Sequence, residues 1–374
     1  MVYWLVALPA PSTGMEGAWA SLQEDTTYSS DLSVNFKFAV PEFKVGTLDS
    51  LLGLSDDLVK VNGAVEGSVN KVRRQLFELQ SAAPTDRSEE EEGGEVRVEG
   101  TSPPDYLQHF EWQEAKYPSK RPLKDTVAAI TEVTQKLDDD LKLRTTEYTQ
   151  QRTLLQAQLR KRTGSLAVRD LSDLVPPGEL VETENLVTLV VVIARSNTPE
   201  FMKSYEGLTE WVVPRSARLV TEDSEYSVVS VVLFRRVVDD FKAAARAKGY
   251  QAKEITSDAE SQKANEEGLE KLRAAVEVKR SEFEAWCLTS YSEAFSAWIH
   301  ILAVRLFVES ILRYGLPPQF LPVLMRPNPK AVAKLRKLLA SKYSGVGGQF
   351  FSNESGADSD LFPYVSFTLN IEER

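Results

Sequence analysis

The most apolar long stretch of the sequence lies near its C-terminal end, at Ser290–Pro318. Most of its apolar residues recur at steps of three or four, which is the period of an α-helix, and others fill the remaining faces. We therefore expect a helix that is buried on most sides and that ends at Gly315, before two prolines. Its apolar stripe consists of Phe295, Trp298, Ile299, Leu302, Leu306, Ile311 and Leu312.

A membrane span is the alternative for this stretch, because its length would suffice. His300, Arg305 and Glu309 lie within it, and one arginine at the centre of a bilayer costs roughly 2.5–3.5 kcal/mol on insertion scales. Glu309 is also placed to pair with Arg313 on one helix face. These charges favour a core helix of a soluble protein.

Two other stretches predict long helices with polar surfaces. No proline or glycine occurs between Lys124 and Thr163, and apolar residues recur there at heptad-like intervals. Ala259–Trp286 repeats the pattern, with Leu269, Val276 and Phe283 on one stripe. A narrow stripe needs only one partner, so we expect an antiparallel pair, with two separate surface helices as the alternative.

The block between these helices, Arg169–Thr256, predicts a small domain of its own. Two apolar, β-branched runs indicate buried strands, and helical patterns follow each of them before a last short strand. This alternation of strand and helix is typical of an α/β domain. The expected elements are strands 186–193, 227–234 and 250–255 and helices 200–211 and 237–248.

The N-terminal part predicts a mixture of strands and helices. Val2–Leu8 reads as a strand rather than a signal-peptide core, because no basic residue precedes it. A helix is expected at 13–23, and a strand at Leu32–Val40 with Leu32, Val34, Phe36 and Phe38 facing the core. Thr47 is expected to cap a helix through Leu52, and Ser55 to begin a longer one. The stripe of that longer helix is Leu58, Val61, Val65, Val69, Val72 and Leu76.

Two further segments interrupt this pattern. Ala82–Pro104 contains Glu89–Glu92 and several glycines and prolines, which is typical of a solvated acidic insertion; a cation or basic-partner site is the alternative. Within it, Val96–Val98 could form a brief strand. The aromatic segment Tyr106–Trp112 follows and is expected in a core.

The order of these elements predicts an α+β fold in the form of an elongated dumbbell. A globular foot combines the N- and C-terminal segments, a long antiparallel helical neck leaves it and returns, and a small α/β head lies between. The expected bounds are foot 1–123, outgoing neck helix 124–167, head 168–256, returning neck helix 257–286 and foot 287–374.

Composition narrows the functional classes. The formal net charge of −11 disfavours a nucleic-acid partner. Cys287 is the one cysteine, so no intrachain disulfide can form; its apolar neighbours predict a buried, inert thiol. Two histidines and one cysteine do not make a standard structural zinc site, and no metal is expected.

No catalytic constellation is evident in the sequence. It contains no GxxxxGK[ST] phosphate loop, GxGxxG dinucleotide fingerprint, GxSxG elbow or HExxH motif. The glycine-rich run Ser344–Gln349 lacks the lysine of a phosphate loop and is interpreted as a plain loop. Neighbouring aspartates such as Asp239 and Asp240 fall in expected helices and diverge there. We therefore expect a protein that is not an enzyme and that uses no cofactor.

Several segments nevertheless resemble one known family, the C subunits of the vacuolar-type proton ATPase (V-ATPase). The similar segments run in the family's order from Val2 to Ile371, so the resemblance is nearly full-length. Ala82–Gly100 and Gly345–Asp360 depart from it, and contacts there are not carried over. The segments are VYWLVALPAP, FAVPEFKVGTLDSLLGLSDDLVKVNGAVEG, HFEWQEAKYPSKRPL, LVTLVVVI, EGLTEWVVPRSARLV, VVLFRRVVDDFKAAARAKG, SEAFSAWIHILAVRLFVESILRYGLPP and FPYVSFTLNI.

The resemblance implies a stator component without catalysis of its own. Family members join the cytosolic ATP-hydrolysing sector to the membrane proton channel, resist rotary torque and are released on reversible disassembly. The head is expected to hold a peripheral stalk made of the E and G subunits. The foot is expected to contact another such stalk and the cytosolic N-terminal domain of the membrane-embedded a-type subunit. The implied location is the cytosolic face of vacuolar or other acidic-organelle membranes, without membrane insertion; actin binding is also attributed to the family.

The matching motifs supply candidate contact residues. In the head these are Trp211, Pro214, Arg215, Phe234, Arg235, Arg236 and Asp240, although Trp211 and Phe234 could equally be core residues. In the foot they are Lys44 and Thr47. Two other functions stay open: an actin-binding scaffold or adaptor, and a nucleotide-dependent enzyme, which the missing phosphate loop disfavours.

Overall fold

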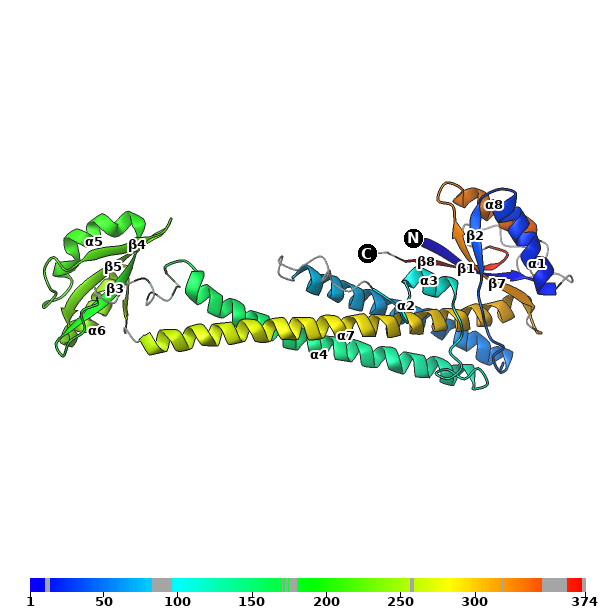
Figure 1. The fold of residues 1–374 in the computed structure, drawn as a ribbon, viewed down its shortest axis with the longest axis horizontal. Coiled ribbons are helices and arrows are strands. Elements are labelled where there is room, and N and C mark those ends of the chain that lie inside the picture. Colours follow the sequence, from blue (N-terminus) through cyan, green and yellow to red (C-terminus); the bar gives the residue numbers. More distant parts are fainter. Residues whose placement is uncertain are drawn as a thin grey trace. The chain divides into compact units, whose positions relative to one another are not determined.

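The computed structural model describes residues 1–10, 14–82, 96–167, 169, 171, 174, 180–255, 259–317, 319–344 and 362–371; the side chains of 259–263 are not described. The chain divides into two compact units. The first unit joins Met1–Arg144 to Ser281–Arg374, and the second unit is Thr145–Arg280. Helices and two antiparallel sheets make up these units, which confirms the α+β class (Figure 1).

The first unit is built on a four-stranded antiparallel sheet in the order β2-β7-β1-β8. Helices α1 and α8 cover one face, where Trp4, Val6 and Leu8 of β1 share a core with Leu22 and Leu335. The strands are β1 Val2–Pro9, β2 Ser33–Lys37, β7 Phe320–Pro327 and β8 Val365–Asn370; the helices are α1 Gly14–Gln23, a π-turn Glu24–Tyr28, and α8 Val332–Tyr343. Sequence patterns did not predict β7 or α8.

Four more helices contribute to the first unit: α2 Leu48–Ser81, α3 Pro103–Gln108, and parts of α4 Leu123–Thr163 and α7 Ala259–Tyr314. The expected apolar helix is the C-terminal part of α7, which is continuous with the expected returning neck helix. Its most apolar 18-residue window has a mean hydropathy of 1.6, and 83% of that window is buried within the protein. That burial favours a core helix over a membrane span.

The charged residues in this helix pair differently from the sequence prediction. Glu309 accepts from Arg305 at 2.8 Å, one turn earlier, rather than from Arg313. Arg313 instead donates to the backbone carbonyls of Phe362 and Tyr364, at 2.5 and 2.9 Å. The loop that leads into β8 needs donors for these carbonyls, and Arg313 supplies them.

Two local predictions in the first unit were wrong. Residues 48–81 form one helix, α2, without a break at Ser55, although Thr47 caps it as predicted by accepting a hydrogen bond from the Ser50 N–H. Leu32 and Phe38, which flank strand β2, are buried as predicted, but within the strand the polar side turns inward. Ser33 and Asn35 are buried there, whereas Val34 is 37% exposed. Asn35 can be buried because it donates to Thr26 Oγ1 at 2.7 Å and accepts from Ser33 at 2.8 Å.

The second unit contains another antiparallel sheet, in the order β4-β5-β3-β6. Phe201, Phe241 and Ala245 of its helices pack on one face, and Leu166, Leu171 and Ile255 cover the other. The elements are β3 Leu186–Ala194, α5 Thr198–Ser204, β4 Arg218–Glu222, β5 Tyr226–Phe234, α6 Val238–Ala247 and β6 Gln251–Glu254. This order is the ferredoxin-like β-α-β-β-α-β arrangement.

The expected α/β label for this block was therefore wrong. Strand β4, which the sequence patterns missed, lies between α5 and β5 and reverses the chain, so that β5 returns antiparallel to β3. The helix expected over 200–211 also ends early, at a 3-10 turn over Tyr205–Gly207. The first unit has the same topology, because β1, β2, β7 and β8 take the places of β3, β4, β5 and β6.

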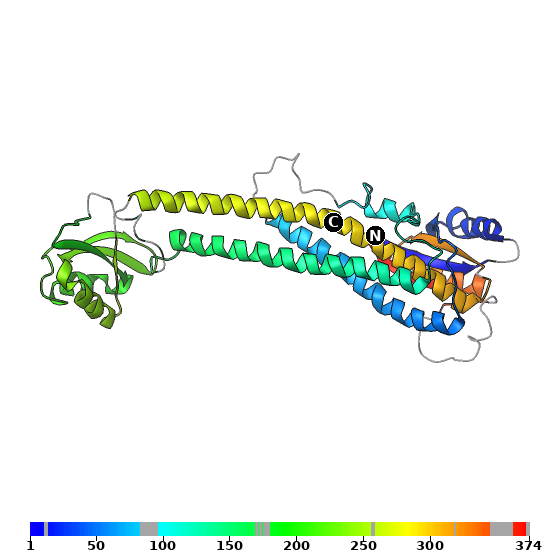
Figure 2. The same cartoon turned by 90° about the horizontal axis from the view of Figure 1, so that it is seen from below.

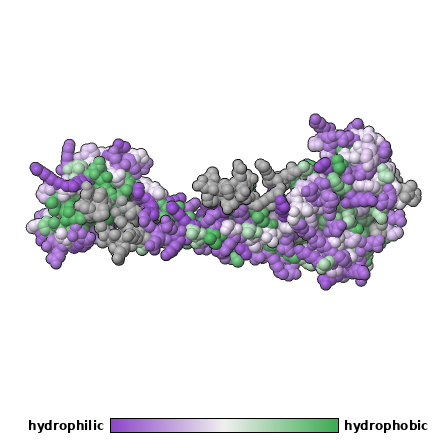
Figure 3. Space-filling model, in the orientation of Figure 1, coloured by the Kyte–Doolittle hydropathy of each residue, from purple (hydrophilic) through white to green (hydrophobic). Residues whose placement is uncertain are grey.

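Within the second unit, α4 and α7 run antiparallel. Arg162 pairs with Glu266 at 2.7 Å, and Glu147 pairs with Lys279 at 3.3 Å. The later position on α4 thus pairs with the earlier position on α7. Figure 2 shows the two helices side by side, and Figure 3 shows a mostly hydrophilic surface along them. The buried stripe of α7 includes Leu269 and Val276 at the predicted seven-residue spacing.

The aromatic segment after α3 is held on α7 by a buried histidine. Phe110, Trp112 and Tyr117 surround His300, with ring centroids 4.8–5.1 Å from the imidazole. His300 Nδ1 donates to the Ser296 carbonyl at 2.7 Å, and Nε2 accepts from the Gln113 N–H at 3.1 Å. Burial, aided by the nearby Lys116 charge, lowers the pKa of His300 to about 4. His300 is therefore neutral, in one tautomer.

Truncation of the α7 core should destabilise the first unit strongly. Leu302 is 1% exposed, and Leu302→Ala is expected to lower the free energy of unfolding by roughly 2–5 kcal/mol, through lost burial and a residual cavity. Leu52→Ala on α2 is the matched control, because Leu52 is 53% exposed; its effect should stay below about 0.5 kcal/mol. Urea unfolding measures both, and equal effects would contradict the burial of α7.

The histidine predicts a loss of stability in acid. The folded-state pKa of about 4 lies below the ordinary 6.5, so the folded chain binds fewer protons. The contribution of His300 to the free energy of unfolding is complete above pH 6.5 and is lost as the pH falls through about 4. The difference between the two pKa values corresponds to roughly 3 kcal/mol. His300→Phe should be less stable at pH 7, with a difference that narrows in acid. Urea unfolding from pH 7 to 4.5 tests this, and a difference that does not narrow would contradict the prediction.

Candidate protein-interaction site

The candidate residues of the second unit meet in a loop beside β5. After the 3-10 turn, residues 211–213 pair with the end of β5: Phe234 N–H donates to the Trp211 carbonyl at 3.2 Å, and Val213 N–H to the Val232 carbonyl at 3.0 Å. The Ser216 hydroxyl donates to the Val213 carbonyl at 2.7 Å and closes the loop. These bonds fix the backbone on both sides of Pro214.

Trp211 takes an unusual conformation in this loop. Its φ is +69°, in the left-handed region that bulky residues rarely occupy, and Arg215 follows with a φ of +56°. Such backbone strain costs on the order of 1–3 kcal/mol and persists only where neighbouring structure enforces it. The indole is nevertheless 53% exposed, so the alternative of a core tryptophan was wrong.

Stacking interactions hold the exposed indole in place. The Arg236 guanidinium lies 3.7 Å from the Trp211 ring centroid, and the Phe234 ring meets the indole edge-on at 5.7 Å and 75°. Phe234 is half-buried and packs against the sheet core, so it supports the indole from beneath. The result is a rigid aromatic surface with a cation stacked on it, which is worth about 0.5–1 kcal/mol at an exposed site.

The charge at this site is positive. Arg215 and Arg236 are exposed, and neither forms an ion pair within the described part of the chain. Glu206 lies close by: the Arg215 N–H and the Tyr205 hydroxyl donate to its carboxylate at 2.9 and 3.0 Å, which lowers its pKa. An exposed indole with one arginine stacked on it and a second on the adjoining loop suits a partner surface that is apolar and acidic.

The other candidates lie apart from this cluster. Arg235 turns toward Glu182, with which it pairs at 3.3 Å. Asp240 is exposed on the first turn of α6. Lys44 and Thr47 of the first unit are also exposed; Lys44 forms a backbone bridge with Pro122, and the Thr47 hydroxyl is occupied as the cap of α2. The structure thus brings together Trp211, Phe234 and Arg236, with Pro214 and Arg215 on the adjoining loop.

Nothing in the described residues suggests reactive chemistry. Cys287 is fully buried on α7, and burial raises the pKa of its thiol to about 12. Among the residues that the structure describes, no three His, Cys, Asp or Glu side chains are grouped so as to hold a metal ion. The cluster around Trp211 is thus characterised by an exposed aromatic ring and arginines rather than by groups suited to catalysis.

The chain is similar over nearly its whole length to one protein family. The family model for the C subunit of V-ATPase matches residues 3–365. The chain is 43% identical to the V-type proton ATPase C subunit of Arabidopsis thaliana, with 99% of both chains covered. It is 38% identical to the C 1 subunit of Xenopus laevis, over 98% of this chain and 97% of the relative.

The chain belongs to the V-ATPase C-subunit family. It is therefore a non-catalytic accessory component of a proton-transporting ATPase and a peripheral component of a membrane complex. Relatives from distant organisms match over the full length; the C 1-B subunit of Danio rerio is 35% identical over 99% of this chain. The membership confirms the family that the sequence segments resembled.

Backbone strain at Trp211 predicts an unusual order of stabilities, in which Trp211→Gly is more stable than Trp211→Ala by roughly 1 kcal/mol. Both variants lose the indole, but only glycine adopts the +69° φ freely. Leu219→Gly and Leu219→Ala on β4 are the controls, because Leu219 is 49% exposed and is not among the positive-φ residues. There the alanine variant should be the more stable. Urea unfolding decides, and an alanine advantage at both sites would show that the Trp211 backbone is not strained.

Proposed function

We propose that this protein is a stator of the rotary ATPase. In this proposal the head, 168–256, holds a stalk made of the E and G subunits. The foot, 1–123 with 287–374, contacts a second stalk and the cytosolic N-terminal domain of the membrane-embedded a-type subunit. The neck helices, 124–167 and 257–286, connect them in a dumbbell and resist torque, at the cytosolic face of vacuolar or other acidic-organelle membranes.

The continuity of α4 and α7 supports the mechanical part of this proposal. Both helices pass the division between the units without a break, at Arg144–Thr145 and at Arg280–Ser281. Helical backbone, in which each turn is hydrogen-bonded to the next, bends much less than a loop does. At that point of α7 the buried Arg280 side chain makes three hydrogen bonds to the Glu277 carboxylate on the preceding turn, at 2.7, 3.0 and 3.2 Å. A connector of this kind suits a protein that must not yield under load.

The single observation that carries the binding part is the strained, exposed Trp211 with Arg236 stacked on it. Tryptophan and arginine dominate the residues that contribute most to protein interfaces. An exposed indole is unfavourable in water, and a strained backbone adds to the cost, so a partner that buries the ring would offset both. The acidic and apolar character that this site requires is compatible with a helical stalk.

In the foot, Lys44 is the stronger of the two candidate contacts. Its side chain is exposed, whereas the Thr47 hydroxyl already accepts from the Ser50 N–H. We propose that Lys44 faces the partners of the foot and that Thr47 positions the start of α2. Release on disassembly would then separate both surfaces from their partners, and actin binding would be a second activity of the free protein.

The double variant Trp211→Gly, Arg236→Gln tests the head. Its affinity for a purified E–G heterodimer should fall roughly 30-fold or more, which corresponds to about 2 kcal/mol for a dominant interface cluster. Arg246→Gln is the matched control, at an exposed arginine of α6 outside the cluster. Calorimetric titration measures affinity, and ATP-driven acidification of vesicles measures pumping. Unchanged affinity in a folded double variant would refute the head assignment, and actin sedimentation with no binding to E–G would favour the scaffold alternative.

A further inference from the structure

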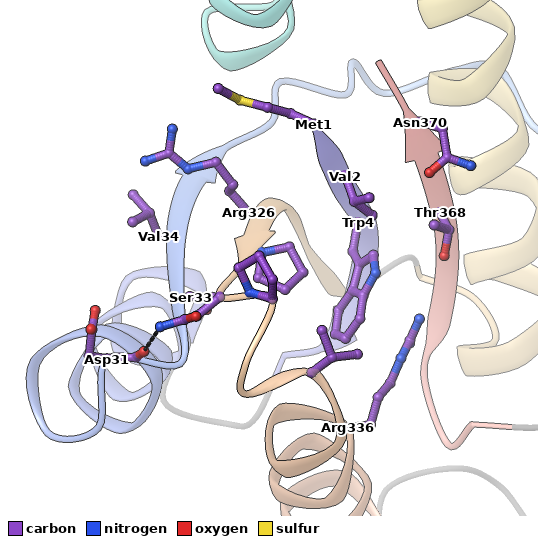
Figure 4. Close-up of a pocket in the computed structure, with 14 residues that line it drawn as sticks. Met1, Val2, Trp4, Asp31, Ser33, Val34, Arg326, Arg336, Thr368 and Asn370 are labelled. Atoms are coloured by element: carbon purple, nitrogen blue, oxygen red, sulfur yellow. Dashed lines mark hydrogen bonds between the residues drawn. The ribbon is translucent and has the colours of Figure 1, made fainter. Parts of the chain in front are cut away.

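The sheet of the first unit splits at one end and leaves a groove there. Strands β1 and β7 pair only as far as Trp4 and Met325, whereas β7 continues along β2 to Pro327 and β1 continues along β8 to Asn370. The two halves of the sheet therefore separate beyond Trp4. A groove with a volume of about 950 Å³ occupies this split, between the start of β1 and the start of α8 (Figure 4).

The groove combines an aromatic floor with an apolar rim. The Trp4 indole is 3% exposed and lines the groove beside Pro327. Four large apolar side chains around it stay accessible, with exposed fractions of 37–50%: Met1, Val2, Val34 and Val332. The outward turn of Val34 on β2, which contradicted the sequence pattern, places it among these residues. Exposed apolar side chains that gather around one hollow are typical of a binding surface.

One wall of the groove carries a guanidinium group that is held rigidly. Arg336 lies between two rings, 3.7 Å from the Trp4 centroid and 4.3 Å from that of Phe362. Its Nη1 donates to Ser366 Oγ at 2.9 Å and to Tyr364 Oη at 3.3 Å. Figure 4 shows its side chain rising beside Trp4 toward Thr368. A guanidinium fixed in this way loses little entropy when it binds a carboxylate.

The charges that line the groove are unbalanced. Neither Arg336 nor Arg326, at the rim, forms an ion pair with any residue that the structure describes. Among the described residues of the lining, one carries a carboxylate, Asp31, and Figure 4 places it at the outer end, away from Arg336. The described part of the lining is therefore positive, in a chain with a formal net charge of −11.

We propose that this groove binds a segment of another protein that presents a carboxylate side chain next to an apolar one. The carboxylate would meet Arg336, and the apolar side chain would cover Val332 and the other exposed apolar residues of the rim. A neutral apolar segment fits less well, because it would shield the arginine from water without supplying a partner charge. A basic segment would be repelled. Binding of an acidic, apolar segment is independent of the stator proposal, since it depends on the chemistry of the groove alone.

Two variants at Val332 separate charge from apolar contact. Val332 is 39% exposed at the first position of α8, where aspartate is favourable to the helix and lysine costs only a few tenths of a kcal/mol. The probe is a fluorescein-labelled twelve-residue peptide in which aspartate alternates with phenylalanine and leucine. Its counterpart carries asparagine in place of aspartate. Fluorescence anisotropy with the full-length chain measures both, and Val59→Asp on α2, at a 51% exposed valine outside the groove, is the control.

The proposal predicts a specific set of outcomes. The aspartate peptide should bind at least tenfold more tightly than the asparagine peptide. Val332→Asp should weaken its binding at least tenfold, Val332→Lys should leave it within about threefold, and Val59→Asp should leave it unchanged. Equal affinity for both peptides, or equal loss in both Val332 variants, would mean a purely apolar groove and would overturn the proposal. Absence of binding would also overturn it, as would a dimer in sedimentation that both Val332 variants abolish.

Discussion

The first unit depends on burying one segment of α7, residues 294–311. Within it only Arg305 and Glu309 are half-exposed, and they neutralise each other. A helix that is apolar on all sides must be covered from every direction. The neighbouring elements α2, α3 and the sheet each attach to it by a hydrogen bond. Helix α2 contributes Asn62, which accepts from Trp298, and α3 contributes Tyr106, hydrogen-bonded to Ser296. The sheet is tied on through the Tyr314 hydroxyl, which donates to the Ala7 carbonyl at 2.7 Å.

The elements that the sequence predicted are those with strong periodicity or long apolar runs. Helices α4 and α7 and strands β1, β3 and β5 belong to this class, and so does the buried Cys287. The missed elements lack such signals. Strand β7 contains Pro322 although it lies between β2 and β1, and proline normally argues against a central strand. Strand β4 is a short, mostly exposed edge with little apolar content.

The Trp211 cluster and the groove at Trp4 could be predicted from the sequence to different degrees. The residues around Trp211 and Phe234 could be named from the sequence, because their segments resemble motifs of the V-ATPase C-subunit family. Their geometry could not, because the left-handed turn at Trp211 is imposed by pairing with β5. The groove escaped prediction altogether. It joins Trp4 to Arg336, which are far apart in the chain, and it depends on an inverted strand whose buried Asn35 is stabilised by Thr26.

The two sheets share a topology but differ greatly in one connection. In the second unit β4 passes to β5 between Glu222 and Tyr226, whereas in the first unit β2 reaches β7 only between Lys37 and Phe320. The whole of the second unit lies within that longer connection. Closing so long a loop from flexible chain would carry a large entropic cost. Folded elements along the connection reduce it, because α2, α3 and the buried part of α7 belong to the same unit as the strands that they join.

Both units stack an arginine on a tryptophan at 3.7 Å, Arg336 on Trp4 and Arg236 on Trp211, and these two pairs are suited to different tasks. The two guanidinium groups lie 3.7 Å from their ring centroids, so the stacking itself is equivalent. Trp4 is 3% exposed and its backbone is ordinary strand, whereas Trp211 is 53% exposed and its φ is strained. Stability alone accounts for the first pair, since a buried indole gains from the contact. Stability does not account for the Trp211–Arg236 pair, because the same stacking is possible without a strained backbone or an exposed ring. The strain and exposure at Trp211 are therefore costs that a partner would offset, whereas the buried Trp4 serves to hold Arg336 in place on the wall of the groove.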